Sequence, residues 1–235
     1  MNDTRARLAV RDLTVSLPDR RLLLRTPRFD VYPGETVILS SESGRGKTTL
    51  LKILAGLISS RRSVIGWSGT ITVDGATLGT VPITEYRRRI YWLAQKPPLE
   101  PGTVRSTFNA ILRYRSGPLR DGAAYTYEKT MATVETLFDT LGLSRSLLDQ
   151  HVTSISGGEA SRVAIVRMLL VSRPLLLLDE PSAGLDAERS RGLLGLIRGY
   201  LPDAAIVVAS HDESLNGDAD TRFVLESGEL VEVRA

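Results

Sequence analysis

The sequence contains no cysteine among its 235 residues, so the fold uses neither a disulfide nor a thiolate metal site. This absence is typical of proteins from a reducing compartment. No apolar run is long enough to span a bilayer. Residues 1–5 lack the apolar core of a secretory signal peptide. We therefore expect a cytoplasmic chain with no transmembrane segment of its own, which meets a membrane only through a partner.

A large excess of charge of one sign is also missing. The chain has 30 basic and 27 acidic residues and a net charge of +3, a balance that does not favour a direct nucleic-acid partner. The length and the 42% hydrophobic content indicate one large globular domain. Lysine is scarce, and its only positions are Lys47, Lys52, Lys96 and Lys129.

One of these few lysines lies in a stretch with the form of a phosphate-binding loop. Residues 36–40 predict a buried strand and residues 50–55 predict a helix. Between them stand Ser41, Glu42, Ser43, Gly44, Arg45, Gly46, Lys47, Thr48 and Thr49. The glycines let backbone N–H groups turn into one cavity, and the helix N-terminus adds partial positive charge. Lys47 would reach the β- and γ-phosphates, and the Thr48 hydroxyl would ligate Mg²⁺.

The alternative for this stretch is an ordinary strand–turn–helix connection with a surface lysine. Ser41 favours that alternative, because the usual phosphate-loop pattern starts with glycine at this place. The rest of the chain therefore has to decide between the two interpretations.

The hydrophobic pattern predicts an α/β fold. Alternating residues over 7–17, 22–24 and 29–31 predict antiparallel strands, and turns at 74–75 and 227–228 predict hairpins. Short apolar runs at 90–94, 175–178 and 204–209 predict further buried strands. Residues 103–150 show helical periodicity and predict a mostly helical insertion.

Three of the predicted buried strands end in polar side chains, namely Gln95, the pair Asp179 and Glu180, and His211. In an open parallel sheet these ends share one edge with the phosphate loop. Asp179 is expected to hold Mg²⁺, and Glu180 to polarise an attacking water. Gln95 can offer its amide oxygen to Mg²⁺ or to that water, and His211 can contact a γ-phosphate and orient Glu180. For each group the alternative is a solvated cap of a strand or loop.

A second turn of small residues opens a predicted helix at Ser156, Gly157, Gly158 and Glu159. Free N–H groups, the helix dipole and the Ser156 hydroxyl are suited to a second anion site. If the two phosphate-binding surfaces cannot face one nucleotide within a chain, they can do so across a dimer. The alternative is an N-capped helix without a ligand.

These motifs occur in an order that resembles the ATP-binding cassette (ABC) ATPases over nearly the whole chain. The matching segments are 44–49, Gln95, 155–159, 175–181, 183–186 and His211. The resemblance implies a RecA-like P-loop NTPase core with an antiparallel β subdomain and an inserted α-helical subdomain. Residues 1–96 and 160–235 would form the core with its β subdomain, and about 97–159 the helical subdomain, in a single nucleotide-binding domain of 1–235.

The resemblance also implies an ATPase with ATP and Mg²⁺ as ligands. Loop 41–49 of one copy and residues 156–159 of a second copy would enclose each ATP in a head-to-tail homodimer or paired cassette. Lys47, Gln95, Glu180 and His211 would be catalytic, and Thr48, Gln95 and Asp179 would hold the metal. The partner would be a transmembrane permease on the cytoplasmic face of the plasma (inner) membrane. The compact size is most similar to small bacterial exporter subunits of the iron-export type.

Three departures from the family pattern stand out. Ser41 replaces the first glycine of the loop, Glu159 stands where many members have glutamine, and residues 15–19 offer no aromatic ring for adenine stacking. Base selectivity for ATP over GTP is therefore open. A non-transport ABC ATPase and a regulatory nucleotide-binding scaffold are the alternative functions. Intact Lys47, Asp179, Glu180 and His211 argue against the scaffold.

Overall fold

The computed structural model describes residues 5–42, 44–59, 64–114 and 126–233. The described strands are β1 Leu8–Ser16, β2 Leu22–Val31, β3 Thr36–Ser40, β4 Gly66–Val73, β5 Ala76–Thr77, β6 Ile90–Leu93, β7 Leu175–Asp179, β8 Ala205–Ala209, β9 Thr221–Glu226 and β10 Glu229–Val233. The described helices are α1 Lys47–Leu54, α2 Ile83–Arg87, α3 Val104–Tyr114, α4 Tyr127–Thr140, α5 Gly157–Val171 and α6 Ala187–Tyr200, with 3₁₀ helices η1 Arg145–Asp149 and η2 Glu213–Asp218.

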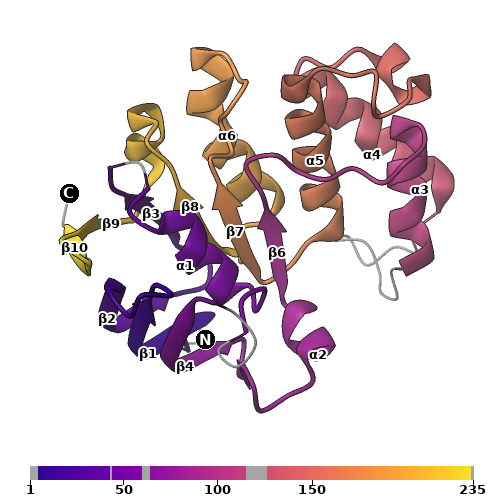
Figure 1. Ribbon diagram of the computed structural model, residues 1–235. Helices are drawn as coiled ribbons and strands as arrows, with labels where there is room; N and C mark the ends of the chain where they lie inside the picture. The colour runs from indigo at the N-terminus through magenta and orange to yellow at the C-terminus, as the bar shows by residue number, and fades with distance from the viewer. Residues whose placement is uncertain (1–4, 43, 60–63, 115–125, 234–235) are drawn as a thin grey trace.

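Within the described ranges the strands form one sheet in the order β5-β4-β1-β2-β10-β9-β3-β8-β7-β6 (Figure 1). Strands β9, β3, β8, β7 and β6 run parallel to one another, whereas β1, β2, β4 and β5 pair antiparallel. The predicted α/β class and the antiparallel set are therefore confirmed. The sequence pattern did not show that both sets belong to one sheet. A single parallel pair, Glu229 with Arg25, joins them.

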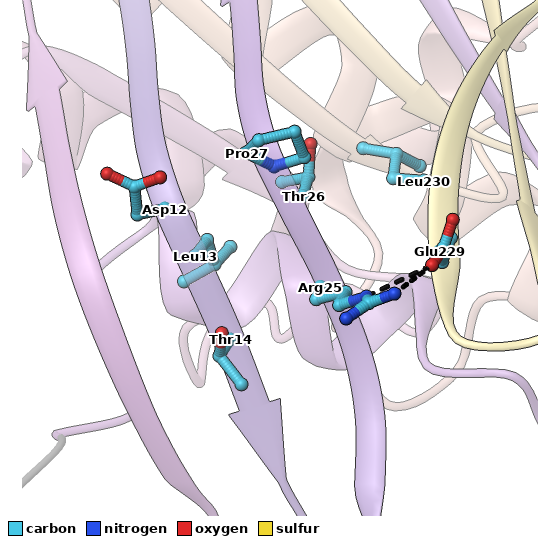
Figure 2. Close-up of a pocket in the computed structure, with 8 residues that line it drawn as sticks. All are labelled: Asp12, Leu13, Thr14, Arg25, Thr26, Pro27, Glu229 and Leu230. Atoms are coloured by element: carbon cyan, nitrogen blue, oxygen red, sulfur yellow. Dashed lines mark hydrogen bonds and ion pairs between the residues drawn. The ribbon is translucent and has the colours of Figure 1, made fainter.

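Where the two sets meet, a groove of about 420 Å³ is lined by residues of β1, β2 and β10 (Figure 2). The guanidinium of Arg25 on β2 donates through Nε to Glu229 Oε1 of β10 at 3.0 Å. Both side chains are at least half exposed, so the pair contributes little to stability. The two parts of the sheet are instead joined by apolar contacts, since one hydrophobic cluster contains residues of β1, β2 and β4 together with residues of β3, β7 and β8.

Turn residues place the hairpins where the sequence predicts them. Asp74 and Gly75, between β4 and β5, both have positive φ, at 47° and 80°. A two-residue turn with positive φ at both positions matches the right-handed twist of the flanking strands. Ser227 and Gly228 repeat this between β9 and β10, at 50° and 79°. The two hairpin predictions are confirmed.

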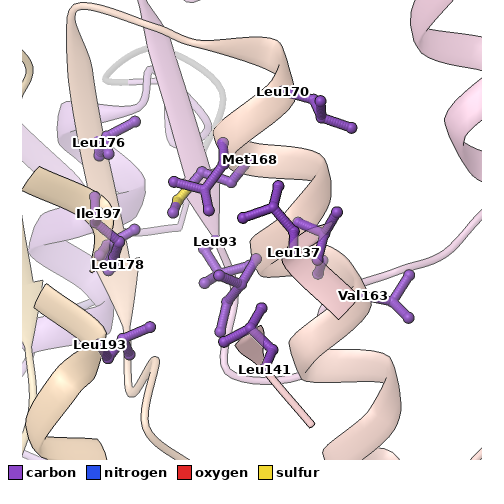
Figure 3. Packing of buried hydrophobic residues seen from close by; sticks show 14 of the residues in the cluster. Leu93, Leu137, Leu141, Val163, Met168, Leu170, Leu176, Leu178, Leu193 and Ile197 are labelled. Atoms are coloured by element: carbon purple, nitrogen blue, oxygen red, sulfur yellow. The ribbon is translucent and has the colours of Figure 1, made fainter. Parts of the chain in front are cut away.

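Strands β3, β7 and β8 are apolar and buried at nearly every position, so both of their faces are covered. In β7, Leu176 and Leu178 pack into the cluster that contains α3 to α6, shown in part in Figure 3. Leu175 and Leu177 pack on the opposite side, with α1 and the antiparallel strands. This alternation follows from the two-residue period of a strand. The parallel pairing of β3, β8, β7 and β6 places their carboxyl ends along one edge.

The residues predicted as a mostly helical insertion form α3, α4 and η1 in the described ranges. Phe108 of α3 and Phe138 of α4 meet edge to face, with ring centroids 5.9 Å apart. Both rings are buried in the same hydrophobic cluster as residues of β6, β7 and β8, so these helices pack against one face of the sheet. Among the described helices none has the length and apolar character needed to cross a bilayer.

Candidate active site

A cavity of about 280 Å³ lies at the carboxyl ends of the parallel strands. Most of the site residues expected from the sequence line it, and they are Gly44, Arg45, Gly46, Lys47, Thr48, Thr49, Gln95, Asp179, Glu180 and His211. They come from the turn after β3, the start of α1 and the ends of β6, β7 and β8. The fold thus gathers groups that lie up to 167 positions apart, from Gly44 to His211, in the sequence.

The turn into α1 depends on Gly46. Its φ of 109° lies in the region that favours glycine, and its carbonyl accepts the N–H of Leu50 at 2.8 Å to start the helix. A Cβ at this position would lie only 3.1 Å from Cγ of Leu23 on β2. The first helical residue is Lys47, so the helix N-terminus faces the cavity. Ser43 lies outside the described residues.

Lys47 is held within the loop. Its Nζ donates to the carbonyl oxygen of Ser41 at 2.8 Å and to the Ser41 hydroxyl at 3.0 Å. Ser41 does not have a positive φ, so replacement of the usual glycine causes no left-handed strain. The departure at Ser41 therefore adds a hydrogen-bond acceptor for Lys47 without a backbone cost.

Arg45 and Glu42 form an ion pair at the rim of the same loop. Arg45 Nε donates to Glu42 Oε2 at 3.1 Å, and both side chains are largely exposed. The guanidinium holds the pKa of the Glu42 carboxyl below its usual range. Glu42 therefore stays ionised, and Arg45 offsets its charge near the anion-binding turn.

Thr48 and Asp179 contact each other directly. Thr48 Oγ1 donates to Asp179 Oδ1 at 3.0 Å, and Asp179 is 4% exposed. Burial raises the pKa of Asp179, and the negative charge of Glu180 raises it further. The hydrogen bond from Thr48 lowers it in part. A hydroxyl beside a carboxylate, with the Gln95 amide on the same cavity, supplies the oxygen donors that Mg²⁺ prefers. The residues present therefore fit this metal together with phosphate oxygens.

Glu180 lies next to Asp179 but has a different environment. Its φ of 50° is rare for a residue with a side chain and costs of order 1 kcal/mol. The Glu180 N–H donates to the Ala209 carbonyl at 2.8 Å, which fixes this backbone to the end of β8. Glu180 Oε1 lies 2.9 Å from His211 Nδ1, and Oε2 accepts from the Ser210 hydroxyl at 3.0 Å. The side chain of Glu180 is 13% exposed, against 80% for His211.

Two residues beside His211 were not identified as site residues from the sequence. Ser210 touches Glu180, and Asp212 accepts hydrogen bonds from the Ser190 hydroxyl and the Ser214 N–H. The signal for both was present, because Ser210 and Asp212 flank His211 at the end of the same buried strand. Nothing in the pattern indicated which side chains they would meet.

The segment Ser156–Glu159 does not line this cavity. Ser156 and Glu159 form a capping box at the start of α5, in which the Ser156 N–H donates to Glu159 Oε2 at 2.8 Å and the Glu159 N–H donates to Ser156 Oγ at 3.2 Å. The backbone N–H and the hydroxyl of Ser156 lower the pKa of Glu159. Ser156 and Gly157 are exposed, so this helix N-terminus is open to a ligand from outside the chain.

Comparison with known proteins gives consistent matches. Residues 24–183 match the family model described as "ABC transporter". An ATP-dependent lipid A-core flippase of Burkholderia thailandensis is 32% identical over 216 residues, which are 91% of this chain and 34% of that protein. The ABC-type transmembrane transporter verA of Clonostachys rogersoniana is 32% identical over 220 residues, 89% of this chain and 16% of that protein. The chain thus spans about a third or less of the length of these curated relatives.

Solved structures share the fold. A bacterial Atm1-family ABC exporter with ATP bound has a TM-score of 0.77 at 26% identity, covering 97% of this chain and 38% of that one. A dimeric ATP-binding cassette in a post-hydrolysis state with ADP and Pi has a TM-score of 0.78 at 22% identity, covering 97% and 99%. The second likeness, at this identity, supports the fold alone. Since the family model covers more than half of the chain and the ordered motifs meet in one cavity, the chain belongs to the ABC transporter family.

Proposed function

We propose that this chain is the ATP-binding and ATP-hydrolysing unit of an ABC membrane transporter and that it couples hydrolysis in a head-to-tail dimer to transport. The observation that carries the proposal is the single cavity in which Lys47, Thr48, Asp179, Glu180 and His211 meet. A regulatory scaffold that only binds nucleotide would not need Glu180 and His211 beside the phosphates.

In this proposal the loop 41–49 and the start of α1 bind the phosphates through backbone N–H groups and the helix dipole. Lys47 turns from Ser41 towards the β- and γ-phosphates when ATP enters. Thr48, Asp179 and Gln95 hold Mg²⁺, which neutralises phosphate charge when it is bound.

Glu180 is the proposed general base. Its carboxylate accepts a proton from a water molecule as the water oxygen forms a bond to the γ-phosphorus. The bond between that phosphorus and the β–γ bridging oxygen breaks, and the electron pair leaves with ADP. His211, which is exposed and touches Glu180, is suited to contact the γ-phosphate.

The second half of the site is proposed to come from another copy of the cassette. Ser156, Gly157, Gly158 and Glu159 do not line the cavity of their own chain, and the exposed N-terminus of α5 suits an external anion. The division into a core of 1–96 and 160–235 and a helical subdomain of about 97–159 is part of the same proposal. In this proposal each cassette has one face that binds ATP and a second face that presents its own helix N-terminus to the ATP of the partner.

A transmembrane permease is the proposed membrane partner, and the cytoplasmic face of the plasma (inner) membrane is the proposed location. Support comes from the relatives, because a lipid A-core flippase and an Atm1-family exporter contain segments similar to this chain. Within this proposal, the transporter is a small bacterial exporter of the iron-export type.

Replacement of the proposed base tests this function. The Glu180→Gln protein should bind ATP, hydrolyse it about 10²- to 10⁴-fold more slowly and accumulate as an ATP-dependent dimer. Lys47→Ala is the companion variant, and it should lose ATP binding. Turnover assays, nucleotide titration and size-exclusion chromatography measure these effects. Unchanged turnover in Glu180→Gln would contradict the role of Glu180, and retained affinity in Lys47→Ala would contradict that of the loop.

A further inference from the structure

We propose that Ser210 is a positioning residue that holds the Glu180 carboxylate in place while His211 is free to move to the phosphate. This inference rests on the proposed function, in which Glu180 is the general base. Ser210 follows β8 directly and is 2% exposed.

The hydrogen bonds around Ser210 determine the direction of its own proton. The backbone N–H of Asp212 donates to Ser210 Oγ at 3.0 Å, so the hydroxyl oxygen is an acceptor there. A hydroxyl has one hydrogen to donate. Glu180 Oε2 lies 3.0 Å from Ser210 Oγ and, as a carboxylate oxygen, can only accept. The Ser210 hydrogen is therefore directed at Glu180.

Ser210 is anchored at its backbone as well. Its N–H donates to the carbonyl oxygen of Leu39 on β3 at 3.2 Å, one residue before the end of the strand that leads into the loop 41–49. The serine thus connects the strand that carries the phosphate loop with the carboxylate proposed to activate water. Because both the backbone and the hydroxyl are bonded, this side chain has little freedom to turn away.

Unlike Ser210, His211 has an exposed side chain that is free to rotate. Its ring is bonded to Glu180 through Nδ1 at 2.9 Å, but the side chain is 80% exposed and faces the cavity. An exposed imidazole can rotate towards an incoming phosphate, and Glu180 would then lose one of its contacts. The buried hydroxyl of Ser210 and the backbone N–H of His211, 3.4 Å from Oε2, would keep the carboxylate oriented.

The remaining charged groups near Glu180 do not take over this task. Lys47 is bonded to Ser41, Arg45 is paired with Glu42, and Asp179 is an acidic neighbour that accepts from Thr48. Among the described residues, Ser210 is thus the side chain besides His211 that donates to Glu180.

A double-mutant cycle tests the proposal on the full chain. Ser210→Ala should lower kcat for ATP by about tenfold, since a hydrogen bond to a charged group is lost, and should leave the KM within about twofold. In the Glu180→Gln background, the same substitution should leave the residual single-turnover rate within about twofold. Ser190→Ala, which removes a hydroxyl bonded to Asp212 instead, is the matched control and should keep kcat within about twofold.

The outcomes separate the two proposals. Unchanged kcat in Ser210→Ala would overturn the positioning role, and so would an equal tenfold loss in both backgrounds, because a purely structural defect acts regardless of residue 180. If Glu180→Gln itself turns over like the unmodified protein, the proposed function fails at Glu180. Slow Glu180→Gln together with normal Ser210→Ala rejects the positioning role alone.

Discussion

At the scale of single residues, Ser41 adds a hydroxyl contact to the phosphate loop without left-handed strain in its backbone. Lys47 Nζ donates to the Ser41 hydroxyl at 3.0 Å and also to the Ser41 carbonyl oxygen at 2.8 Å. Lys47 must give up these contacts before it reaches a phosphate. The extra acceptor therefore favours the nucleotide-free position of Lys47.

Removal of the hydroxyl should release Lys47 in part. We predict that Ser41→Ala binds ATP about threefold more tightly, because one hydrogen bond less is broken on binding. Titration with a fluorescent ATP analogue in the Glu180→Gln background avoids interference from hydrolysis. Ser40→Ala is the control, since the Ser40 hydroxyl bonds to the Phe223 carbonyl instead. Weaker binding by Ser41→Ala would show that the hydroxyl assists the phosphate contacts.

The location of the site residues was easier to predict from the sequence than their hydrogen-bond partners. Lys47, Thr48, Asp179, Glu180 and His211 could be expected at one edge because each follows or ends a recognisable apolar strand or turn. Whether Ser41 would be strained depended on a single φ value, which residue type does not determine. The hydrogen bond from Ser210 to Glu180 joins the ends of two strands 30 positions apart, and local pattern carries no information on such a contact.

At the scale of elements, the segment after β8 is fixed by a carboxylate. The Asp212 carboxylate accepts hydrogen bonds from the Ser190 hydroxyl on α6 and from the Ser214 N–H at the start of η2. Hydrogen bonds from Ser190, Ser214 and Ser182 hold the pKa of Asp212 well below its usual range. The ionised carboxylate thus connects α6 with the segment that carries His211.

This arrangement makes part of the stability depend on pH. Since the pKa is lower in the folded chain, the contribution is fully present above the unfolded pKa of about 4 and is lost as the pH falls below it. We predict that Asp212→Asn lowers the free energy of unfolding at pH 7 and that the difference from the unmodified protein shrinks towards pH 3. Urea unfolding at a series of pH values measures it, and Ser190→Ala should reproduce part of the effect. A difference that stays constant from pH 7 to pH 3 would contradict this account.

Elements were well predicted where the periodicity was unambiguous. Strand β3 occupies the expected residues 36–40, and the runs at 90–94, 175–178 and 204–209 became β6, β7 and β8 with shifts of one residue at an end. The two segments 22–24 and 29–31 are parts of one strand, β2, because Arg25, Thr26 and Arg28 stay paired with β1 on both sides of Pro27. Proline is tolerated there because β2 pairs with β10 at only one residue on its other side.

At the scale of the whole molecule, the sheet unites two parts that the sequence presents as separate. The pairing of β10 with β2 joins residues more than 200 positions apart, and no local signal predicts it. The layers on the two faces of β7 could be expected, because its four consecutive leucines leave neither face suited to water.

The whole molecule also separates Ser156–Glu159 from the cavity that binds the phosphates in our proposal. The central claim is therefore that one chain holds the loop, the metal ligands and the base, while a second copy supplies the helix N-terminus. Gly157 is a suitable position to test that N-terminus, because a Cβ there would have no atom within 4 Å apart from its chain neighbours and the backbone of its own helix.

The most direct measurement is the ATPase rate of mixed variants. Lys47→Ala and Gly157→Asp should each be inactive alone, whereas an equimolar mixture should regain up to roughly a quarter of the unmodified rate, since half of the dimers carry one intact site. A mixture of Lys47→Ala and Glu180→Gln should stay inactive, because both defects lie in the same half of the site and no dimer has an intact one. A Lys47→Ala and Gly157→Asp mixture that stays as inactive as its components would contradict the account.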